Sequence, residues 1–203
     1  MGRADRVREL LDEYGTTYAD EAGITLRDKP APLYRLLALT VLLAGRIKAD
    51  IAVATARELF RAGWRTPKAL LDSTWQQRVD ALGRGHYKRY DESTATYLAD
   101  GARLLVEKYR GDLRRLRDEA GKDPEAIREL LTEFPRIGPT GAEIFCREAQ
   151  SVWPELRPSF DRKALTAARD AGLPDDAKAL AKLVPGDQLS RLAAALVRRS
   201  LSH

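Results

Sequence analysis

Residues 134–145 read FPRIGPTGAEIF, and this stretch decides how the rest of the chain is interpreted. Pro135 cannot continue a helix, because its ring clashes with the preceding turn. Gly138 can adopt a positive φ without a Cβ clash, and Pro139 has the fixed φ that suits the first turn of a helix. The stretch therefore predicts two helices joined by a tight turn, with Arg136 at its tip.

A turn of this kind can bind an anion. The backbone N–H groups of Gly138, Thr140 and Gly141 are expected to point outward, where hydrogen bonds and the helix dipole favour phosphate. Gly141 would let a phosphate backbone approach closely, and Arg136 would add a positive charge. The alternative is an ordinary corner between two helices, which binds nothing.

Helical periodicity dominates the remainder of the sequence. Apolar residues recur three and four positions apart near the N-terminus and again over 91–109, and residues 33–44 are apolar on nearly every side. The apolar run over 33–44 predicts a central buried helix. Residues 15–32 are polar and contain glycines and prolines, so we expect a connector there. Since no segment alternates with period two, the sequence predicts an all-α fold.

The composition is that of a globular protein with an excess of basic residues. The 203 residues are 44% hydrophobic, which suits a globular chain with a real core. Lys and Arg total 35 against 30 acidic residues, a net charge of +5. This excess favours an anionic partner, nucleic acid first, although a modestly basic surface without such a partner gives the same number.

Cysteine and histidine usage excludes several kinds of site. Cys146 is the only cysteine, so a disulfide framework, a cysteine-based zinc site and a four-cysteine iron–sulfur cluster are all excluded. His86 has no second histidine nearby, and we expect no metal site. The charged N-terminus is not a signal peptide, and the longest apolar run, 33–45, contains Arg35 and is too short for a membrane span. A cytoplasmic protein is expected.

Taken with its neighbours, FPRIGPTGAEIF resembles the helix-hairpin-helix of the endonuclease III-like DNA glycosylase superfamily. Downstream, residues 153–165 (WPELRPSFDRKAL) resemble the family's glycine- and proline-rich segment, and Asp161 falls at the place of the family's aspartate. Upstream, 33–60 resembles the buried helix, the loop that faces the lesion and the next helix. Residues 82–105 resemble the loop and helix that precede the hairpin.

The resemblance covers roughly residues 30–170 and implies an all-α, two-lobed helix-hairpin-helix DNA glycosylase fold. The central lobe is expected over 31–150, and the second lobe over 1–30 together with 151–203. Double-stranded DNA would lie at the cleft between them, with the hairpin on one side and Asp161 on the other. We expect a monomer associated with the nucleoid, with no membrane partner.

Asp161 is the candidate catalytic residue. Breaking an N-glycosidic bond builds positive charge on the sugar, and a fixed carboxylate can stabilise that charge and orient or activate a water. The target base must first be flipped out of the stack. The resemblance implies this role for Asp161. Its alternative is the N-cap of the following helix, a position that aspartate favours, and the two roles are compatible.

The sequence departs from the family pattern at three positions. Thr140 stands where bifunctional members carry a lysine, and a hydroxyl cannot form the Schiff base that supports strand cleavage. We therefore expect little or no AP-lyase activity, unless Lys163 supplies an amine. Arg136 replaces the first hairpin glycine, and Arg46 corresponds to a glutamine in the loop that faces the lesion. No cofactor is expected, apart from a monovalent cation at the hairpin carbonyls.

Candidate DNA contacts come from four segments. The loop after the buried helix contributes Arg46 and Lys48, which would fill the gap of a flipped base or simply be solvated. Residues 83–90 (GRGHYKRY) interleave basic residues with tyrosines, which suits backbone binding and wedging. A charged loop with its tyrosines packed inward is the alternative for that segment. The full set is Arg136, Ile137, Gly138, Thr140, Gly141, Arg46, Lys48, Arg84, His86, Lys88 and Lys163.

The sequence thus favours a DNA repair glycosylase that hydrolyses the N-glycosidic bond of a flipped, damaged base with Asp161 and water. A non-catalytic relative that recognises damaged or bent DNA is the alternative. A helical protein-interaction module, in which the hairpin is merely a corner, is a weaker third.

Overall fold

The computed structural model describes residues 2–202. Within this range, all regular secondary structure is helical. The predicted all-α fold is confirmed. The α-helices are α1 (Arg3–Tyr14), α2 (Tyr18–Glu21), α3 (Pro30–Leu43), α4 (Ala49–Arg61), α5 (Pro67–Leu71), α6 (Trp75–Arg84), α7 (Asp91–Tyr109), α8 (Leu113–Glu119), α9 (Pro124–Leu131), α10 (Pro139–Ala149), α11 (Arg162–Asp170), α12 (Ala177–Leu180) and α13 (Leu189–Leu201). Short 3₁₀ helices cover Pro154–Leu156 (η1) and Gly186–Gln188 (η2).

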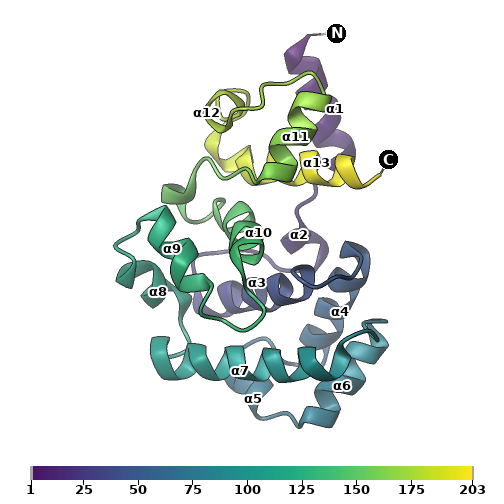
Figure 1. Ribbon diagram of the computed structural model, residues 1–203, viewed down its shortest axis with the longest axis vertical. Helices are drawn as coiled ribbons and strands as arrows, with labels where there is room; N and C mark the ends of the chain where they lie inside the picture. Colours follow the sequence, from purple (N-terminus) through teal and green to yellow (C-terminus); the bar gives the residue numbers. More distant parts are fainter. Residues whose placement is uncertain (1, 203) are drawn as a thin grey trace.

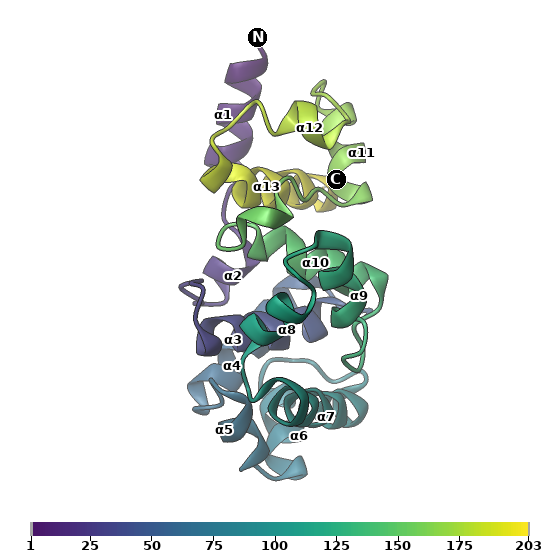
Figure 2. The ribbon, with the colours of Figure 1, turned by 90° about the vertical axis from the view of Figure 1, so that its left-hand side faces the viewer.

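The helices gather in two groups along the long axis of the molecule. α1, α11, α12 and α13 lie at one end and α3 to α9 at the other, with α2 and α10 between them (Figure 1). The same division is visible after a quarter turn (Figure 2). α13 packs against α1, α10 and α11. The first and last helices of the chain are therefore neighbours, and both termini lie at the same end.

α3 is the centre of the larger group. Two prolines in its first turn suit a helix start, and the apolar run that follows is buried on all sides, as expected for a helix at the heart of a core. It packs against α4, α7, α8 and α10. The predicted central helix is confirmed.

In the part of the chain described, no helix combines the length with the apolar character that a membrane crossing needs.

The turn between α9 and α10 is built differently from the expectation. Gly138 precedes α10 with φ −90° and ψ −168°, which is extended backbone open to any residue. The left-handed residue is Arg136, with φ 67°. The prediction of a positive φ at Gly138 is wrong, because the chain reverses direction two residues earlier. A non-glycine residue in this conformation costs about 1–2 kcal/mol.

The expected connector over 15–32 contains α2, a helix too short to show periodicity. The hydroxyl of Thr17 caps it by accepting a hydrogen bond from the Asp20 N–H at 3.1 Å. The buried carboxylate of Glu148, on α10, accepts hydrogen bonds from the N–H groups of Tyr18 and Ala19 at 3.1 and 3.2 Å. Burial raises the pKa of Glu148 despite these bonds. α2 is therefore fixed to the helix that follows the turn.

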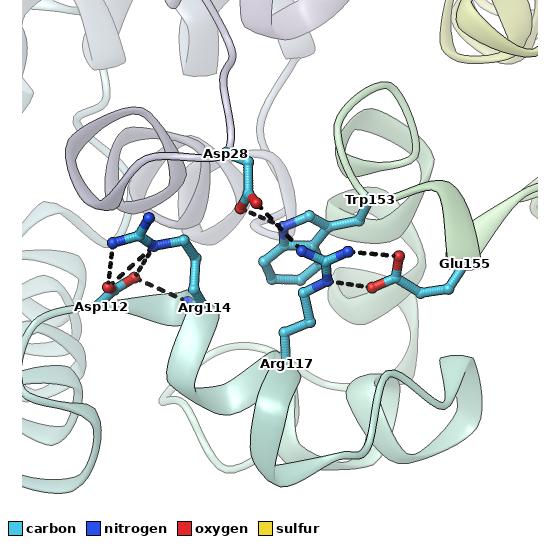
Figure 3. A network of polar contacts seen from close by, with 6 residues as sticks. All are labelled: Asp28, Asp112, Arg114, Arg117, Trp153 and Glu155. Carbon is cyan, nitrogen blue, oxygen red and sulfur yellow. Dashed lines mark hydrogen bonds and ion pairs between the residues drawn. The ribbon is translucent and has the colours of Figure 1, made fainter.

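A second polar network ties the chain after α10 to the start of α3 (Figure 3). Asp28 accepts a hydrogen bond from the indole of Trp153 at 2.9 Å and another from Arg117 at 3.2 Å. Arg117 also forms a two-point ion pair with Glu155, in which one N–O distance is 2.9 Å. Three segments distant in sequence are thus joined around one half-buried guanidinium. Asp112 and Arg114 form a separate, local pair at the start of α8.

Candidate functional site

A cavity of about 790 Å³ lies where the two helix groups meet, within the size range of small-ligand sites. We call it the Asp161 cavity. α10 contributes residues spaced by three and four positions, which places them on one helical face. α11, α13 and the loop before α4 contribute the other walls. The lining residues are Tyr18, Leu43, Ile47, Lys48, Ala49, Thr140, Glu143, Ile144, Arg147, Asp161, Arg162, Lys163, Thr166, Ala167, Asp170, Val197, Ser200 and Leu201.

Asp161 is fixed at both carboxylate oxygens. It is the N-cap of α11, and its Oδ1 accepts a hydrogen bond from the Ala164 N–H at 2.8 Å. Its Oδ2 accepts a hydrogen bond from Nη1 of Arg147 at 2.6 Å. The side chain is 15% exposed and lines the cavity. The capping role considered from the sequence is therefore real, and it coexists with an orientation toward the cavity.

Arg147 is a site residue that sequence reasoning missed. Its side chain is only 4% exposed, and its guanidinium lies 5.7 Å from the ring centre of Tyr18. Arg198, on α13, lies 4.2 Å from the same ring and forms an ion pair with Glu21. Burial raises the pKa of Tyr18, although the two arginines act in the opposite direction. The sequence offers one signal for it. Arg147 follows Thr140 by seven residues, which is two helical turns and therefore the same face of the helix.

The segment that leads into Asp161 is fixed by Gln150, another residue without a sequence signal. The Gln150 side-chain amide donates to the carbonyl of Ser159 at 2.8 Å and accepts from its N–H at 2.9 Å. Both side chains are buried. The end of α10 therefore sets the path of the backbone two residues before Asp161.

The sequence candidates divide between two places. Asp161, Thr140, Lys48 and Lys163 all line the cavity, although they come from three separate segments. The remaining candidates that are not buried lie outside it, at the turn, on the loop that precedes α4, and on the end of α6 and the loop that follows it. Those outside are Arg136, Gly138, Arg46, Arg84, His86 and Lys88.

At the turn, Arg136 contacts aromatic rings. Its guanidinium lies 5.0 Å from the ring centre of Tyr97 and 5.7 Å from that of Tyr90. Arg89 lies 5.0 Å from the ring of Tyr90 on the same surface. Such cation–π contacts offset the cost of the left-handed backbone at Arg136. They also connect the turn to the start of α7.

Two other residues of the turn, Ile137 and Gly141, face inward. Ile137 is buried. A Cβ at Gly141 would lie 3.2 Å from Ile137 and 3.5 Å from Ala44, so this glycine allows α10 to approach the end of α3. This packing gives Gly141 a structural reason, and its approach to phosphate stays a prediction. Within residues 2–202, the N–H groups of Gly138, Thr140 and Gly141 donate no hydrogen bond.

Residues 83–90 place one tyrosine inside the protein and one on its surface. Tyr87 is fully buried, with its hydroxyl against Gly45 in the loop after α3. Tyr90 is 40% exposed. His86 and Lys88 are exposed, and Arg84 lies 3.5 Å from Glu58. One tyrosine therefore anchors the loop, while the other remains on the surface with the cations.

Two solved structures are similar to this chain. One is a trapped covalent intermediate of endonuclease III with DNA, in an estranged-adenine complex, with 19% sequence identity and a TM-score of 0.52. The other is a non-covalent endonuclease III–DNA complex, with 20% identity and a TM-score of 0.54. Each match covers 97% of this chain and 85% of the other.

No family model matches the sequence, and no curated protein matches it. At 19–20% sequence identity, the similarity to these two structures shows a shared fold. This chain has the all-helical fold of endonuclease III.

Proposed function

We propose that this protein is a DNA repair glycosylase, which flips a damaged base into the Asp161 cavity and hydrolyses its N-glycosidic bond. One observation carries the proposal: Asp161 lines a cavity of about 790 Å³ between α10 and α11. A carboxylate in a cavity of this size suits a reaction that develops positive charge on a bound sugar. The fold shared with endonuclease III, whose two structures contain DNA, adds support.

The proposed reaction uses few protein groups. The base departs with the electron pair of the N-glycosidic bond, and the sugar becomes cationic. The fixed carboxylate of Asp161 stabilises that cation, and a water adds at the same carbon and loses a proton, which the departed base takes up. Thr140 lines the cavity but has no amine, so no Schiff base forms there. We therefore propose a monofunctional enzyme with little or no AP-lyase activity.

DNA would bind across the meeting point of the two helix groups. The turn before α10 and residues 83–90 would contact the phosphate backbone through Arg136, Arg84, His86 and Lys88. Arg46 and Lys48 would face the gap that the flipped base leaves. Part of this proposal is that the groups act as two lobes, 31–150 and 1–30 with 151–203, in a monomer associated with the nucleoid.

The residues do not fit the four-cysteine iron–sulfur cluster that many endonuclease III relatives carry. Cys146 is the only cysteine in the sequence, and its thiol is buried within α10. Burial raises the pKa of this thiol to about 12, which disfavours the thiolate that a cluster needs. We propose that catalysis uses no cluster. A monovalent cation at the carbonyls of the turn remains part of the proposal.

A non-catalytic relative that binds damaged DNA is the second candidate. The observation in its favour is that both oxygens of Asp161 already have hydrogen-bond partners, Ala164 and Arg147. A carboxylate paired with a guanidinium presents less negative charge to a substrate than an unpaired one.

A base-release assay separates the two candidates. The protein is incubated with duplexes that carry a panel of damaged bases, and hot alkali then cleaves the strand wherever a base has been lost. Release at one or more lesions is expected, and Asp161→Asn should reduce it to a slow residual rate while DNA binding persists. Asparagine still caps a helix, so α11 should remain folded in this variant. Binding without release at any lesion would favour the non-catalytic relative.

A further inference from the structure

We propose that Arg147 is a positioning residue, which sets the orientation of the Asp161 carboxylate toward the cavity. The inference rests on the proposed function for its kinetic consequence, but its geometric content is independent of activity. Nothing in the sequence pattern assigns Arg147 a role, and no candidate above included it.

Two hydrogen bonds hold the carboxylate of Asp161. The Ala164 N–H fixes Oδ1 at 2.8 Å, as in any capped helix. That bond alone leaves the carboxylate plane free to rotate about the capped oxygen. The second bond, from Nη1 of Arg147 to Oδ2 at 2.6 Å, removes this freedom. The carboxylate is therefore held by two helices, α10 and α11, at the boundary between the helix groups.

Arg147 is itself held by its surroundings at the start of α2. Arg147 and Glu148 are consecutive residues of α10, and both contact Tyr18. The guanidinium of Arg147 lies 5.7 Å from the tyrosine ring, while the Glu148 carboxylate accepts a hydrogen bond from the tyrosine N–H at 3.1 Å. Tyr18 is buried. Arg147 therefore cannot shift sideways without disturbing the first turn of α2.

The positive charge of Arg147 also ties it to Asp161. The side chain of Arg147 is 4% exposed, and a cation with so little access to water needs nearby negative charge. Asp161 is its ion-pair partner, and its Nε donates no hydrogen bond within residues 2–202. The pair is therefore the main constraint on the guanidinium as well as on the carboxylate. If either partner is removed, the other loses its fixed position.

A kinetic double-mutant cycle tests this role on any duplex that the wild-type protein processes. Single-turnover rates are measured for Arg147→Met, Asp161→Asn and the double variant, together with DNA affinity. We expect Arg147→Met to slow base release about 10- to 100-fold, with DNA affinity changed less than about twofold, because positioning acts on the chemical step. Arg147→Lys should recover part of the rate. In the Asp161→Asn background, Arg147→Met should have no further effect.

Equal losses from Arg147→Met in both backgrounds would overturn the proposal, as would an unchanged rate. Arg117→Met is the matched control, since Arg117 is also a little-exposed, ion-paired arginine but lies outside the cavity. It should leave the single-turnover rate unchanged. A general loss of packing would slow both arginine variants.

A crystal structure of Arg147→Met decides the question even if the wild-type protein releases no base. In that case the proposed function fails, while the geometric claim is still tested. We expect the Asp161 carboxylate to keep its bond to Ala164 and to rotate away from the cavity or to occupy several orientations. A carboxylate that keeps its wild-type orientation would overturn the role of Arg147.

Discussion

The Asp161 cavity and the surface around Arg136 use charge in opposite ways. In the cavity, Asp161 and Arg147 lie 2.6 Å apart, and both are largely shielded from water. Around Arg136, Lys88 and Arg89 are exposed, and neither forms an ion pair within residues 2–202. The first arrangement fixes a carboxylate, while the second leaves cations on the surface without an acidic partner among the described residues.

Under the proposed function, this difference gives the two regions separate tasks. A shielded, paired carboxylate has one orientation, which is what a reaction at a single bond requires. Exposed cations attract a polyanion without needing a fixed geometry, and their effect is screened by salt. Mutations in the cavity should therefore change rates at constant affinity. Mutations near Arg136 should change affinity at constant rate.

The largest expected contrast is the gain of a covalent intermediate in the cavity. Thr140→Lys places an amine in the wall that also contains Asp161. An amine there can attack the sugar of an abasic duplex, and borohydride reduces the resulting Schiff base to a stable adduct. We expect adduct from Thr140→Lys and little from the wild-type protein. An adduct with the wild-type protein that is lost in Lys163→Arg would assign the nucleophile to Lys163.

The network of Figure 3 provides a third region, which is ion-paired like the cavity but contributes no residue to its lining. Arg117→Met removes the hydrogen bonds to Asp28 and Glu155, and should lower the free energy of unfolding by about 2 kcal/mol at pH 7. Base release should not change.

The same network predicts a pH dependence. Burial acts to raise the pKa of Glu155, but the hydrogen bonds from Arg117 outweigh it and leave that pKa below its ordinary value. A lowered carboxylate pKa contributes stability above the unfolded value of about 4.3, and the contribution is lost as the pH falls through the folded value. The difference in unfolding free energy between wild-type and Arg117→Met should therefore shrink below about pH 4. Denaturant titrations at pH 7 and at acidic pH measure it. A gap that is constant with pH would contradict the assigned ion pair.

At the turn, Arg136→Glu should weaken DNA binding about tenfold, because a cation near the phosphates becomes an anion. Arg136→Gly separates charge from backbone strain. Glycine suits the φ of 67°, so this variant should unfold no more easily than the parent and still bind DNA more weakly. Fluorescence anisotropy and thermal unfolding measure the two effects. Unchanged affinity in both variants would remove the turn from the DNA-binding surface.

The smallest effect is expected for a single exposed lysine on residues 83–90. Lys88→Ala should weaken binding only a few-fold, and should lower the slope of log affinity against log salt by about 1. Lys68→Ala, on α5 and outside the Asp161 cavity, is the matched control. Equal slopes for the two variants would show that Lys88 contacts no phosphate.

Local patterns predicted the long elements and failed where tertiary contacts decide. α3 and α7 follow from apolar spacing, and the cap at Asp161 follows from its residue type. α2 was missed because a four-residue helix has no period to detect and depends on Glu148 from a distant segment. The positive φ was assigned to Gly138 by residue preference, while contacts with Tyr90 and Tyr97 favour it at Arg136.

Within the site, the sequence could indicate single residues but not their pairing. Asp161 and Thr140 came from the family resemblance, and both line the cavity. Arg147 carries no local signature of function, since an arginine in an amphipathic helix normally faces solvent. Its role depends on a 2.6 Å contact between residues fourteen positions apart, which only the folded chain reveals.

The central claim is that the Asp161 carboxylate stabilises positive charge on a sugar in the cavity. It is tested most directly by the affinity for two abasic duplexes, one with a neutral tetrahydrofuran ring and one with a cationic pyrrolidine ring. The wild-type protein should bind the cationic duplex at least about tenfold more tightly, as expected for a mimic of the charged transition state. Asp161→Asn should bind the two duplexes equally. Equal affinity of the wild-type protein for both duplexes, or a preference that survives in Asp161→Asn, would contradict the claim.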